Sequence, residues 1–172
     1  SQFVSSALSL SKDNSSAAII GGGDGGVARE LSSKGFDLID WYELDPEVVK
    51  VCQKHLQKVC GDIKANNKVK TYWGDAFESI KKVKDQKYDK IFVDLNDDQF
   101  CINLAAKNMK GLKRILKPGG VITAQVGCLS KKPKQVKNWM ELLQNNFGNV
   151  KLSEAFIPSF DCRWNFASSS HK

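Results

Sequence analysis

The sequence predicts a doubly wound α/β protein whose sheet is mostly parallel and ends with an antiparallel strand. The first observation is the glycine-rich stretch 21–26, Gly-Gly-Gly-Asp-Gly-Gly, between the apolar run 17–20 and the helix-forming stretch 27–31. The second is that strand-like and helix-like stretches alternate until two strand-like stretches close the chain. Such alternation indicates parallel strands joined by helices, and a glycine turn between strand and helix is typical of the Rossmann-like fold.

The first half of the chain is expected to contain three strands. Residues 1–16 are polar and serine-rich, and they are expected to form a lead-in helix or a loose tail before one domain at 17–172. Proline is favoured at the first position of a helix, so Pro46 is expected to open one. The expected elements are a strand at 17–21, a helix at 26–34, a strand at 37–45, a helix from Pro46 through Val59, a strand at 69–73 and a short helix after Asp75.

The second half is expected to complete the sheet. A helix at 100–116 is expected to end at Lys117-Pro-Gly-Gly120, because proline and glycine together are a common helix stop signal. The other expected elements are a strand at 88–95, a strand at 121–126, a helix at 134–147, and a terminal pair of strands at 150–156 and 163–168.

Acidic side chains follow four successive predicted strands. Ligands of doubly wound sheets bind beyond the carboxyl ends of the strands, so these acids are expected along one edge. Each acid alone is explained as a helix cap or a turn residue. Their shared edge favours a binding site for a cation. The acids are Asp24 after the first strand, Glu43 and Asp45 after the second, Asp75 after the third, and Asp94, Asp97 and Asp98 after the fourth.

The glycine loop and its neighbours are expected to bind a nucleoside that carries a positive charge. Glycines let the backbone approach a ligand closely, whereas Asp24 would repel a pyrophosphate. Glu43 follows about twenty residues later, where an acid can accept both ribose hydroxyls. A sulfonium would supply the positive charge. The expected loop contacts are Gly21, Gly22, Gly23 and Gly25, and the expected adenine contacts are Leu44, Asp75, Ala76 and Leu95.

The composition argues against several other classes of protein. The chain has 172 residues, of which 41% are hydrophobic and 26% charged, as in ordinary globular domains. No apolar run approaches the ~20 residues of a membrane span and no signal-peptide pattern is present, so a cytoplasmic location is expected. The net charge of +7 arises from dispersed lysines without a nucleic-acid motif, which indicates a solvated surface rather than a nucleic-acid site.

The cysteines are expected to be free thiols. Five cysteines lie far apart without a Cys-x-x-Cys pair, which favours a reducing compartment over a disulfide framework. Cys52, His55 and Cys60 fall within one predicted helix, but only Cys52 and His55 share a face of it. No metal site is therefore expected.

Six short motifs resemble those of one enzyme family. They are Gly21-Gly-Gly-Asp-Gly-Gly-Val27, Tyr42-Glu-Leu-Asp45, Gly74-Asp75, Val93-Asp94-Leu95, Leu116-Lys-Pro-Gly-Gly120 and Ile157-Pro-Ser-Phe160. Together they resemble the polyamine aminopropyltransferases, the spermidine and spermine synthases, over roughly residues 17–168. The segments 51–62 and 158–164 are more similar to the spermine synthase branch. The resemblance implies a class I methyltransferase-like version of the Rossmann fold.

The resemblance also implies an activity. An aminopropyl group would pass from decarboxylated S-adenosylmethionine to putrescine or spermidine, with release of 5′-methylthioadenosine. Asp24 would bind the amino group of the donor and repel the carboxylate of ordinary S-adenosylmethionine. Asp94 would orient the acceptor amine and take its proton. The residues expected to contact the substrates are Asp24, Asp97, Gln125 and Phe160.

Some positions depart from the family's pattern. Members of the family carry a β-rich N-terminal region before the glycine loop, which is expected to be missing here. Phe160 stands where spermidine synthases place a tyrosine, and Cys162 stands where the spermine synthase branch has a glutamate. A homodimer, or a partner that supplies the missing region, is expected.

Two alternatives remain open. The chain could be a non-catalytic relic domain that binds the nucleoside and needs a partner. It could also be an S-adenosylmethionine-dependent methyltransferase, since one fold supports several chemistries. Asp24 argues against the methyltransferase, because the methionine carboxylate would lie near it.

Overall fold

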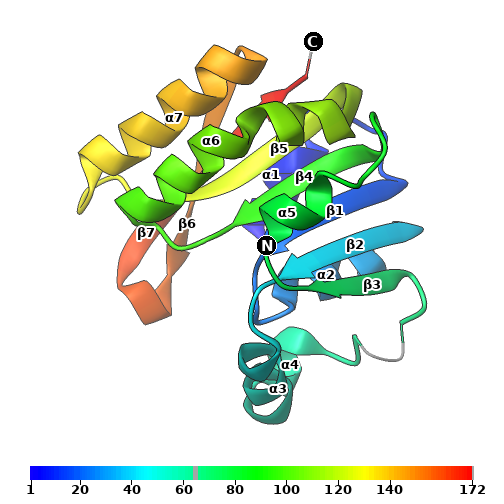
Figure 1. Ribbon diagram of the computed structural model, residues 1–172. Coiled ribbons are helices and arrows are strands. Elements are labelled where there is room, and N and C mark those ends of the chain that lie inside the picture. The colour runs from blue at the N-terminus through cyan, green and yellow to red at the C-terminus, as the bar shows by residue number, and fades with distance from the viewer. Residues whose placement is uncertain (64–65, 172) are drawn as a thin grey trace.

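The computed structural model describes residues 1–63 and 66–171. They form a seven-stranded sheet with the order β3-β2-β1-β4-β5-β7-β6 (Figure 1). All neighbouring pairs are parallel except the two that β7 makes with β5 and β6. The predicted mostly parallel sheet with a terminal antiparallel strand is therefore confirmed. The strands are β1 (Ser16–Gly21), β2 (Leu38–Glu43), β3 (Val69–Trp73), β4 (Tyr88–Asp94), β5 (Leu116–Cys128), β6 (Val150–Ile157) and β7 (Cys162–Ser170).

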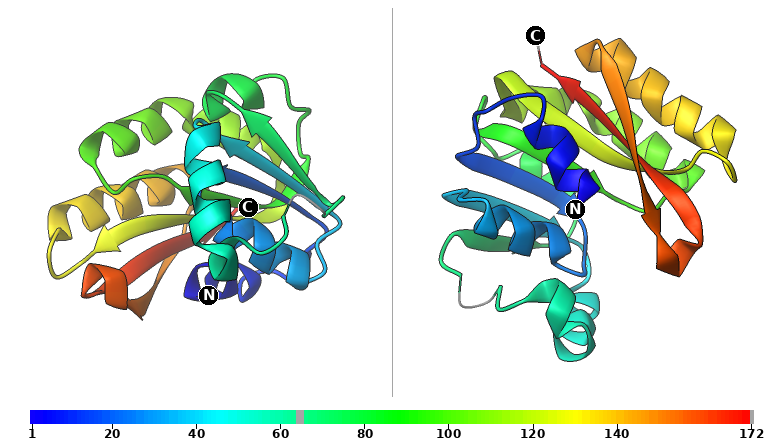
Figure 2. Two further views of the ribbon diagram at one scale, coloured as in Figure 1. Left: turned by 90° about the horizontal axis from the view of Figure 1, so that it is seen from below. Right: turned by 180° about the vertical axis from the view of Figure 1, so that it is seen from behind.

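Helices cover both faces of the sheet (Figures 1 and 2). The buried side chains of α5, α6 and α7 belong to one apolar cluster with the sheet, and those of α1, α2, α3 and α4 belong to a second cluster. Two cores on opposite faces are what a doubly wound sheet requires. The helices are α1 (Gln2–Leu8), α2 (Gly26–Ser33), α3 (Pro46–His55), α4 (Gln57–Cys60), α5 (Ala76–Ile80), α6 (Gln99–Ile115) and α7 (Pro133–Phe147), with a 3-10 turn η1 at Pro158–Phe160.

The helix α6 shows how the sequence specifies these elements. Its buried residues recur every three or four positions and so form one face. The helix begins where the side chain of Asp98 accepts a hydrogen bond from the backbone N–H of Cys101. Burying each of the larger apolar side chains stabilises the fold by about 1.5–3 kcal/mol. The buried residues are Ile102, Ala105, Met109, Leu112 and Ile115.

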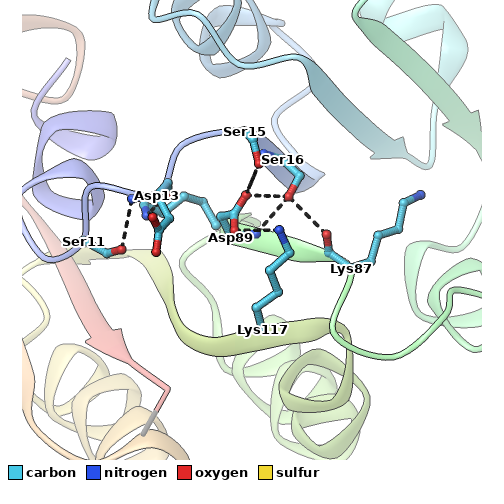
Figure 3. Close-up of polar contacts among 8 residues, drawn as sticks. Ser11, Asp13, Ser15, Ser16, Lys87, Asp89 and Lys117 are labelled. Atoms are coloured by element: carbon cyan, nitrogen blue, oxygen red, sulfur yellow. Dashed lines mark hydrogen bonds and ion pairs between the residues drawn. The ribbon is translucent and has the colours of Figure 1, made fainter.

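Of the segment expected as a lead-in helix or a loose tail, residues 2–8 form the helix α1, which joins the core. The ring of Phe3 in α1 stacks on Phe166 with a centroid distance of 5.2 Å and meets the edge of Phe92 at 5.5 Å. The segment between α1 and β1 is held by polar contacts at the N-terminal edge of the parallel strands (Figure 3). There the buried Asp89 accepts hydrogen bonds from Ser15, Ser16 and Lys117.

Asp89 is a buried carboxylate, and hydrogen bonds offset the cost of burying its negative charge. Burial by itself raises its pKa, but the hydrogen bonds from Lys117, Ser15 and Ser16 outweigh burial and hold the pKa below its ordinary value of 3.8. The neighbouring Lys90 is fully buried and donates to the backbone carbonyl of Asp13 at 2.6 Å. Residues 13–16 are thus fixed to the edge of the sheet opposite the acids considered below.

Two predicted boundaries are wrong. The helix expected from Pro46 through Val59 breaks at Leu56, whose φ of −121° and ψ of 42° are not helical, so that α4 is a separate turn. The stop signal 117–120 does end α6, but it lies within β5 rather than in a loop. The backbone of Gly119 and Gly120 bonds to His171 at 2.8 and 2.7 Å, which continues the pairing between β5 and β7.

The expectation of five free thiols is also wrong. Cys128 at the end of β5 and Cys162 at the start of β7 form a disulfide, with their Cα atoms 6.3 Å apart. The two cysteines are 34 residues apart in the chain, so only the antiparallel pairing of β5 with β7 brings them together. Cys52, Cys60 and Cys101 are free.

Two kinds of feature are absent from the described residues. No group of three His, Cys, Asp or Glu side chains in residues 1–63 and 66–171 is arranged to hold a metal ion. Among the described helices, none combines the length and the apolar character that a membrane crossing needs.

Candidate active site

The carboxyl ends of β1, β2 and β4 meet at one edge of the sheet. Strand β1 lies between the other two, with Gly21 paired to Asp94 and Ile20 paired to Tyr42. The backbone N–H of Gly22 donates to the carbonyl of Asp94 at 3.0 Å. The predicted shared edge of glycine loop and acids is therefore confirmed for Asp94, and Glu43 follows Tyr42 at the same edge.

Glycine is required where the loop crosses Asp94. Gly21 and Gly22 have φ angles of +82° and +72°, which side chains rarely allow. A Cβ on Gly21 would stand 2.5 Å from the carbonyl oxygen of Asp94. A Cβ on Gly22 would stand 2.8 Å from the carboxylate oxygen Oδ2 of Asp94. The loop is thus built for a close approach to this carboxylate.

Asp94 is the acid with the strongest electrostatic perturbation at this edge. Burial, together with the negative charges of Asp24 and Glu43, raises its pKa to about 7. A carboxyl group with such a pKa can accept or release a proton near neutral pH. Three carboxylates that affect one another also make the edge attractive to a cation.

Glu43 is held rigidly beside the loop. Its side chain is only 8% exposed, and its Oε1 accepts a hydrogen bond from the backbone N–H of Asp45 at 3.0 Å. Its second oxygen, Oε2, lies 3.4 Å from the point where a Cβ on Gly23 would stand. The loop therefore passes directly over this carboxylate.

Four of the other acids have the ordinary role of capping a helix or turn. Each accepts a hydrogen bond from the backbone N–H two or three residues later in the chain, which satisfies a free donor at the helix start. The cap explanation therefore holds for these four side chains. The pairs are Asp24 with Gly26 at 2.8 Å, Asp45 with Glu47 at 2.8 Å, Asp75 with Phe77 at 2.8 Å and Asp98 with Cys101 at 2.8 Å.

The predicted adenine contacts lie around the same edge. Ala76 begins α5 directly after Asp75, and Leu95 lies against the loop, with its Cδ2 atom 3.1 Å from the Cβ position of Gly21. Leu44 is 71% exposed, so its side chain is open to solvent. Contact of these residues with a ligand remains a prediction.

A second group of predicted residues lies beside β4, at the ends of β5 and β7. Gln125 donates to the backbone carbonyl of Leu95, and its Oε1 accepts from the indole N–H of Trp164 at 2.7 Å. The rings of Trp164 and Phe160 have centroids 4.4 Å apart. Gln125 and Phe160 are thus connected through Trp164, a residue to which the sequence analysis gave no role.

Asp97 is already paired within the chain. Its Oδ2 lies 3.0 Å from the ammonium of Lys132, in the loop between β5 and α7. Lys132 was not predicted as a site residue, because along the sequence it is one of many dispersed lysines. The same loop contacts the η1 turn, since Lys131 donates to the carbonyls of Phe160 at 3.0 Å and Asp161 at 3.1 Å.

This chain is similar to a known domain family, to related sequences and to solved structures. Residues 1–172 match the spermine/spermidine synthase domain. A polyamine aminopropyltransferase of Prochlorococcus marinus strain MIT 9215 is 33% identical over 179 residues, which cover 98% of this chain and 62% of the relative. One from strain MIT 9515 is 35% identical over 176 residues, covering 96% of this chain and 61% of the relative. This chain thus spans about three-fifths of these relatives.

Solved structures share the fold. A spermidine synthase in complex with the transition-state analogue AdoDATO superposes with a TM-score of 0.81 at 21% identity, over 92% of this chain and 55% of the other. The spermidine synthase of Thermotoga maritima gives a TM-score of 0.80 at 21% identity, over 92% and 54%. The relatives do not distinguish the spermine synthase branch, so that part of the resemblance remains a prediction. Because the family match extends over every residue, this chain belongs to the spermine/spermidine synthase domain family.

Proposed function

We propose that this chain transfers an aminopropyl group from decarboxylated S-adenosylmethionine to putrescine or spermidine and releases 5′-methylthioadenosine. The observation that carries the proposal is the Asp94 carboxyl group, whose pKa of about 7 results from burial and from the charges of Asp24 and Glu43. A group that titrates near neutral pH is suited to act as a general base. The relatives named polyamine aminopropyltransferase supply the reaction class.

The donor would lie along the edge formed by β1, β2 and β4. The open backbone of the glycine loop allows its close approach, and Glu43 presents a fixed carboxylate for the ribose hydroxyls. Asp75 and Ala76 would contact adenine, with Leu44 and Leu95 on the two faces of the ring. The sulfonium is a cation and is stabilised by the same carboxylates. No metal takes part in the proposed reaction.

Asp24 would select the decarboxylated donor. Its backbone cap uses Oδ1, so that a second carboxylate oxygen remains for the donor's amino group. The carboxylate of ordinary S-adenosylmethionine would bring like charges together at this point, which costs binding energy. The same argument disfavours methyl transfer.

The acceptor would reach the donor from the side of Asp97, Gln125 and Phe160. Only a neutral amine can attack, because an ammonium has no free electron pair. Asp94 accepts the proton, the amine nitrogen forms a bond to the carbon beside the sulfonium, and the carbon–sulfur bond breaks. Its electrons neutralise the sulfonium, and 5′-methylthioadenosine leaves as a thioether. Positioning two substrates in one site supplies much of the rate enhancement.

A direct assay tests this proposal. Release of 5′-methylthioadenosine is measured from decarboxylated S-adenosylmethionine with putrescine, with spermidine and without an acceptor. Wild-type protein is expected to show release that depends on the acceptor, and Asp94→Asn is expected to lose it by about 10²–10⁴-fold. Asp45→Asn, which alters a helix cap on the same edge, is the matched control. Equal activity of Asp94→Asn and wild type would contradict the proposal.

A non-catalytic nucleoside-binding domain is the second candidate. It is favoured by the ion pair that Lys132 already makes with Asp97 at 3.0 Å, which occupies a carboxylate on the side proposed for the acceptor. A ligand that binds only the folded state raises the melting temperature. Stabilisation by 5′-methylthioadenosine without any turnover would therefore support this candidate over the enzyme.

The proposal includes two statements about context. A homodimer, or a complex with a partner chain, is proposed as the working form, and sedimentation velocity with and without donor tests the homodimer. A cytoplasmic location is also proposed, as the place of a polyamine-forming enzyme. The Cys128–Cys162 disulfide counts against this location, because reducing compartments disfavour disulfides. Cell fractionation with detection of the protein in each fraction tests the location.

A further inference from the structure

The ion pair between Lys132 and Asp97 occupies a carboxylate at the acceptor side of the candidate site. The ammonium nitrogen and Oδ2 are 3.0 Å apart, and the two side chains are 51% and 24% exposed. Lys132 is therefore mostly in solvent, whereas the carboxylate it covers is largely enclosed. Such a pair can open without disturbing the core, because exposed ion pairs are weak.

Asp97 also lies close to the backbone of Gly127 and to the side-chain amide of Gln135. A Cβ on Gly127 would stand 3.2 Å from Oδ2 of Asp97 and 3.2 Å from the amide nitrogen of Gln135. That amide nitrogen is buried and makes no hydrogen bond in the described structure. The backbone of Gly127 is thus packed closely against the Asp97 carboxylate and an amide that has no hydrogen-bond partner in the described structure.

The chemistry of Lys132 matches that of the proposed acceptor. A lysine side chain is a four-carbon chain that ends in a primary ammonium. Putrescine and spermidine end in the same group on carbon chains of similar length. Asp97 would attract either ammonium, so both cannot pair with it fully at once.

We propose that Lys132 is a tethered competitor for the terminal ammonium of the acceptor, which must displace it from Asp97. This inference rests on the proposed function. The displacement breaks one ion pair as it forms another, so it weakens acceptor binding. The chemical step at Asp94 is unaffected, because the displaced ion pair is at Asp97. Lys132 thus acts on specificity and on the KM for the amine, and not as a catalytic residue.

Three lysine variants test the competition. Lys132→Met keeps the length of the side chain and removes its charge, and it is expected to lower the KM for the acceptor about two- to five-fold with kcat unchanged. Lys132→Arg keeps the charge and is expected to retain the wild-type KM. Lys134→Met is the matched control, because this exposed lysine at the start of α7 carries the same charge. An unchanged or raised KM in Lys132→Met would overturn the inference.

A double-mutant cycle assigns the effect to the pair. In the background of Asp97→Asn, Lys132→Met is expected to change the KM by less than about 1.5-fold, since the carboxylate for which both amines compete is gone. A decrease that persists in that background would mean that Lys132 repels the acceptor from a distance, and the proposed displacement would be wrong.

A binding measurement separates this inference from the proposed reaction. Titration calorimetry of spermidine into protein saturated with 5′-methylthioadenosine requires no turnover. Tighter binding to Lys132→Met than to wild type and Lys134→Met would support the inference even if neither protein releases product. Equal binding to all three proteins would overturn it, whereas absence of turnover alone would count only against the proposed function.

Discussion

The carboxylate of Asp94 lies against the backbone of Gly22, with its Oδ2 atom 2.8 Å from the point where a Cβ on Gly22 would stand. Gly22 also has a φ of +72°, a conformation that glycine adopts without strain. Glycine at this position thus allows the positive φ that the turn needs and leaves space for the Asp94 carboxylate. Mutations can separate these two effects.

Replacing Gly22 by alanine is expected to lower 5′-methylthioadenosine release about 10- to 100-fold, because the new methyl group displaces the Asp94 carboxylate. The unfavourable φ also costs about 1–2 kcal/mol of stability. Gly35→Ala is the control, since Gly35 has a φ of +86° but nothing within 4 Å of its Cβ position. It is expected to lose similar stability and keep its activity. Activity is measured as 5′-methylthioadenosine release and stability by urea denaturation. Equal losses of activity in both variants would refute the idea that the close packing of Gly22 against Asp94 is needed for activity.

The pH dependence of turnover reports the proton affinity of Asp94. Because the pKa of about 7 is that of the proposed base, kcat is expected to rise with pH through about 7 and to level off above it. The charge of Asp24 contributes to this pKa, so Asp24→Asn is expected to shift the rise to lower pH. A rise that stays at the same pH in Asp24→Asn would argue that another group is responsible.

The carboxylates of the partly buried Asp94 and the buried Asp89 are expected to affect stability in opposite directions. The folded pKa of Asp94 lies above its ordinary value of 3.8, so the wild type loses stability as pH rises from about 4 to about 7. The stability of Asp94→Asn relative to wild type is therefore expected to increase as the pH rises over this range. The folded pKa of Asp89 lies below its ordinary value, so its contribution is present above about 4 and is lost as pH falls. Asp89→Asn is expected to have a lower free energy of unfolding than wild type at pH 7, and this difference is expected to shrink as the pH falls. Urea denaturation between pH 3 and 8 measures the free energy of unfolding of both variants and of wild type.

The disulfide makes a prediction that needs no substrate. Unreduced protein in denaturant is expected to react with a thiol reagent at three cysteines, and reduced protein at five. Cys162→Ser is expected to lower the free energy of unfolding by about 2–4 kcal/mol, because the crosslink no longer restricts the unfolded chain. Cys101→Ser, at a free cysteine, is the control. Five reactive thiols before reduction would show that the bridge does not form.

The parts of the site that the sequence predicts are those fixed by local signals. A glycine turn after an apolar strand and an acid at the end of the next strand are both visible along the chain. The rule that parallel strands present their carboxyl ends at one edge then places Glu43 beside Asp94 without further information. The same local view cannot separate a binding acid from a helix cap or a turn residue. Three of the predicted acids, Asp45, Asp75 and Asp98, are helix caps, and Asp24 closes a turn.

The parts that the sequence does not predict depend on contacts between distant segments. The pairing of β5 with β7 brings Cys128 to Cys162 and Gln125 to Trp164. The contact of Lys132 with Asp97 joins residues 35 positions apart. Such pairs have no periodicity that a sequence can show, since they follow from strand order and side-chain reach. The strand that contains 117–120 is a similar case, because its backbone pairing outweighs the local propensity of proline and glycine.

The central position of β1 next to β4 has a consequence for how the molecule folds. The bonds that join the two strands link residues as far apart as Ser16 and Asp89, 73 positions along the chain. Contacts of such high sequence separation carry a large loop-closure entropy and slow the search for the native state. During folding, the glycine turn would form early. Asp94 would reach it only when the long chain segment between β1 and β4 has closed and the two strands have paired. Pulse-labelling hydrogen exchange during refolding is therefore expected to protect the amides of α6 before that of Gly22, so that the edge with the glycine loop is among the last parts of the fold to assemble.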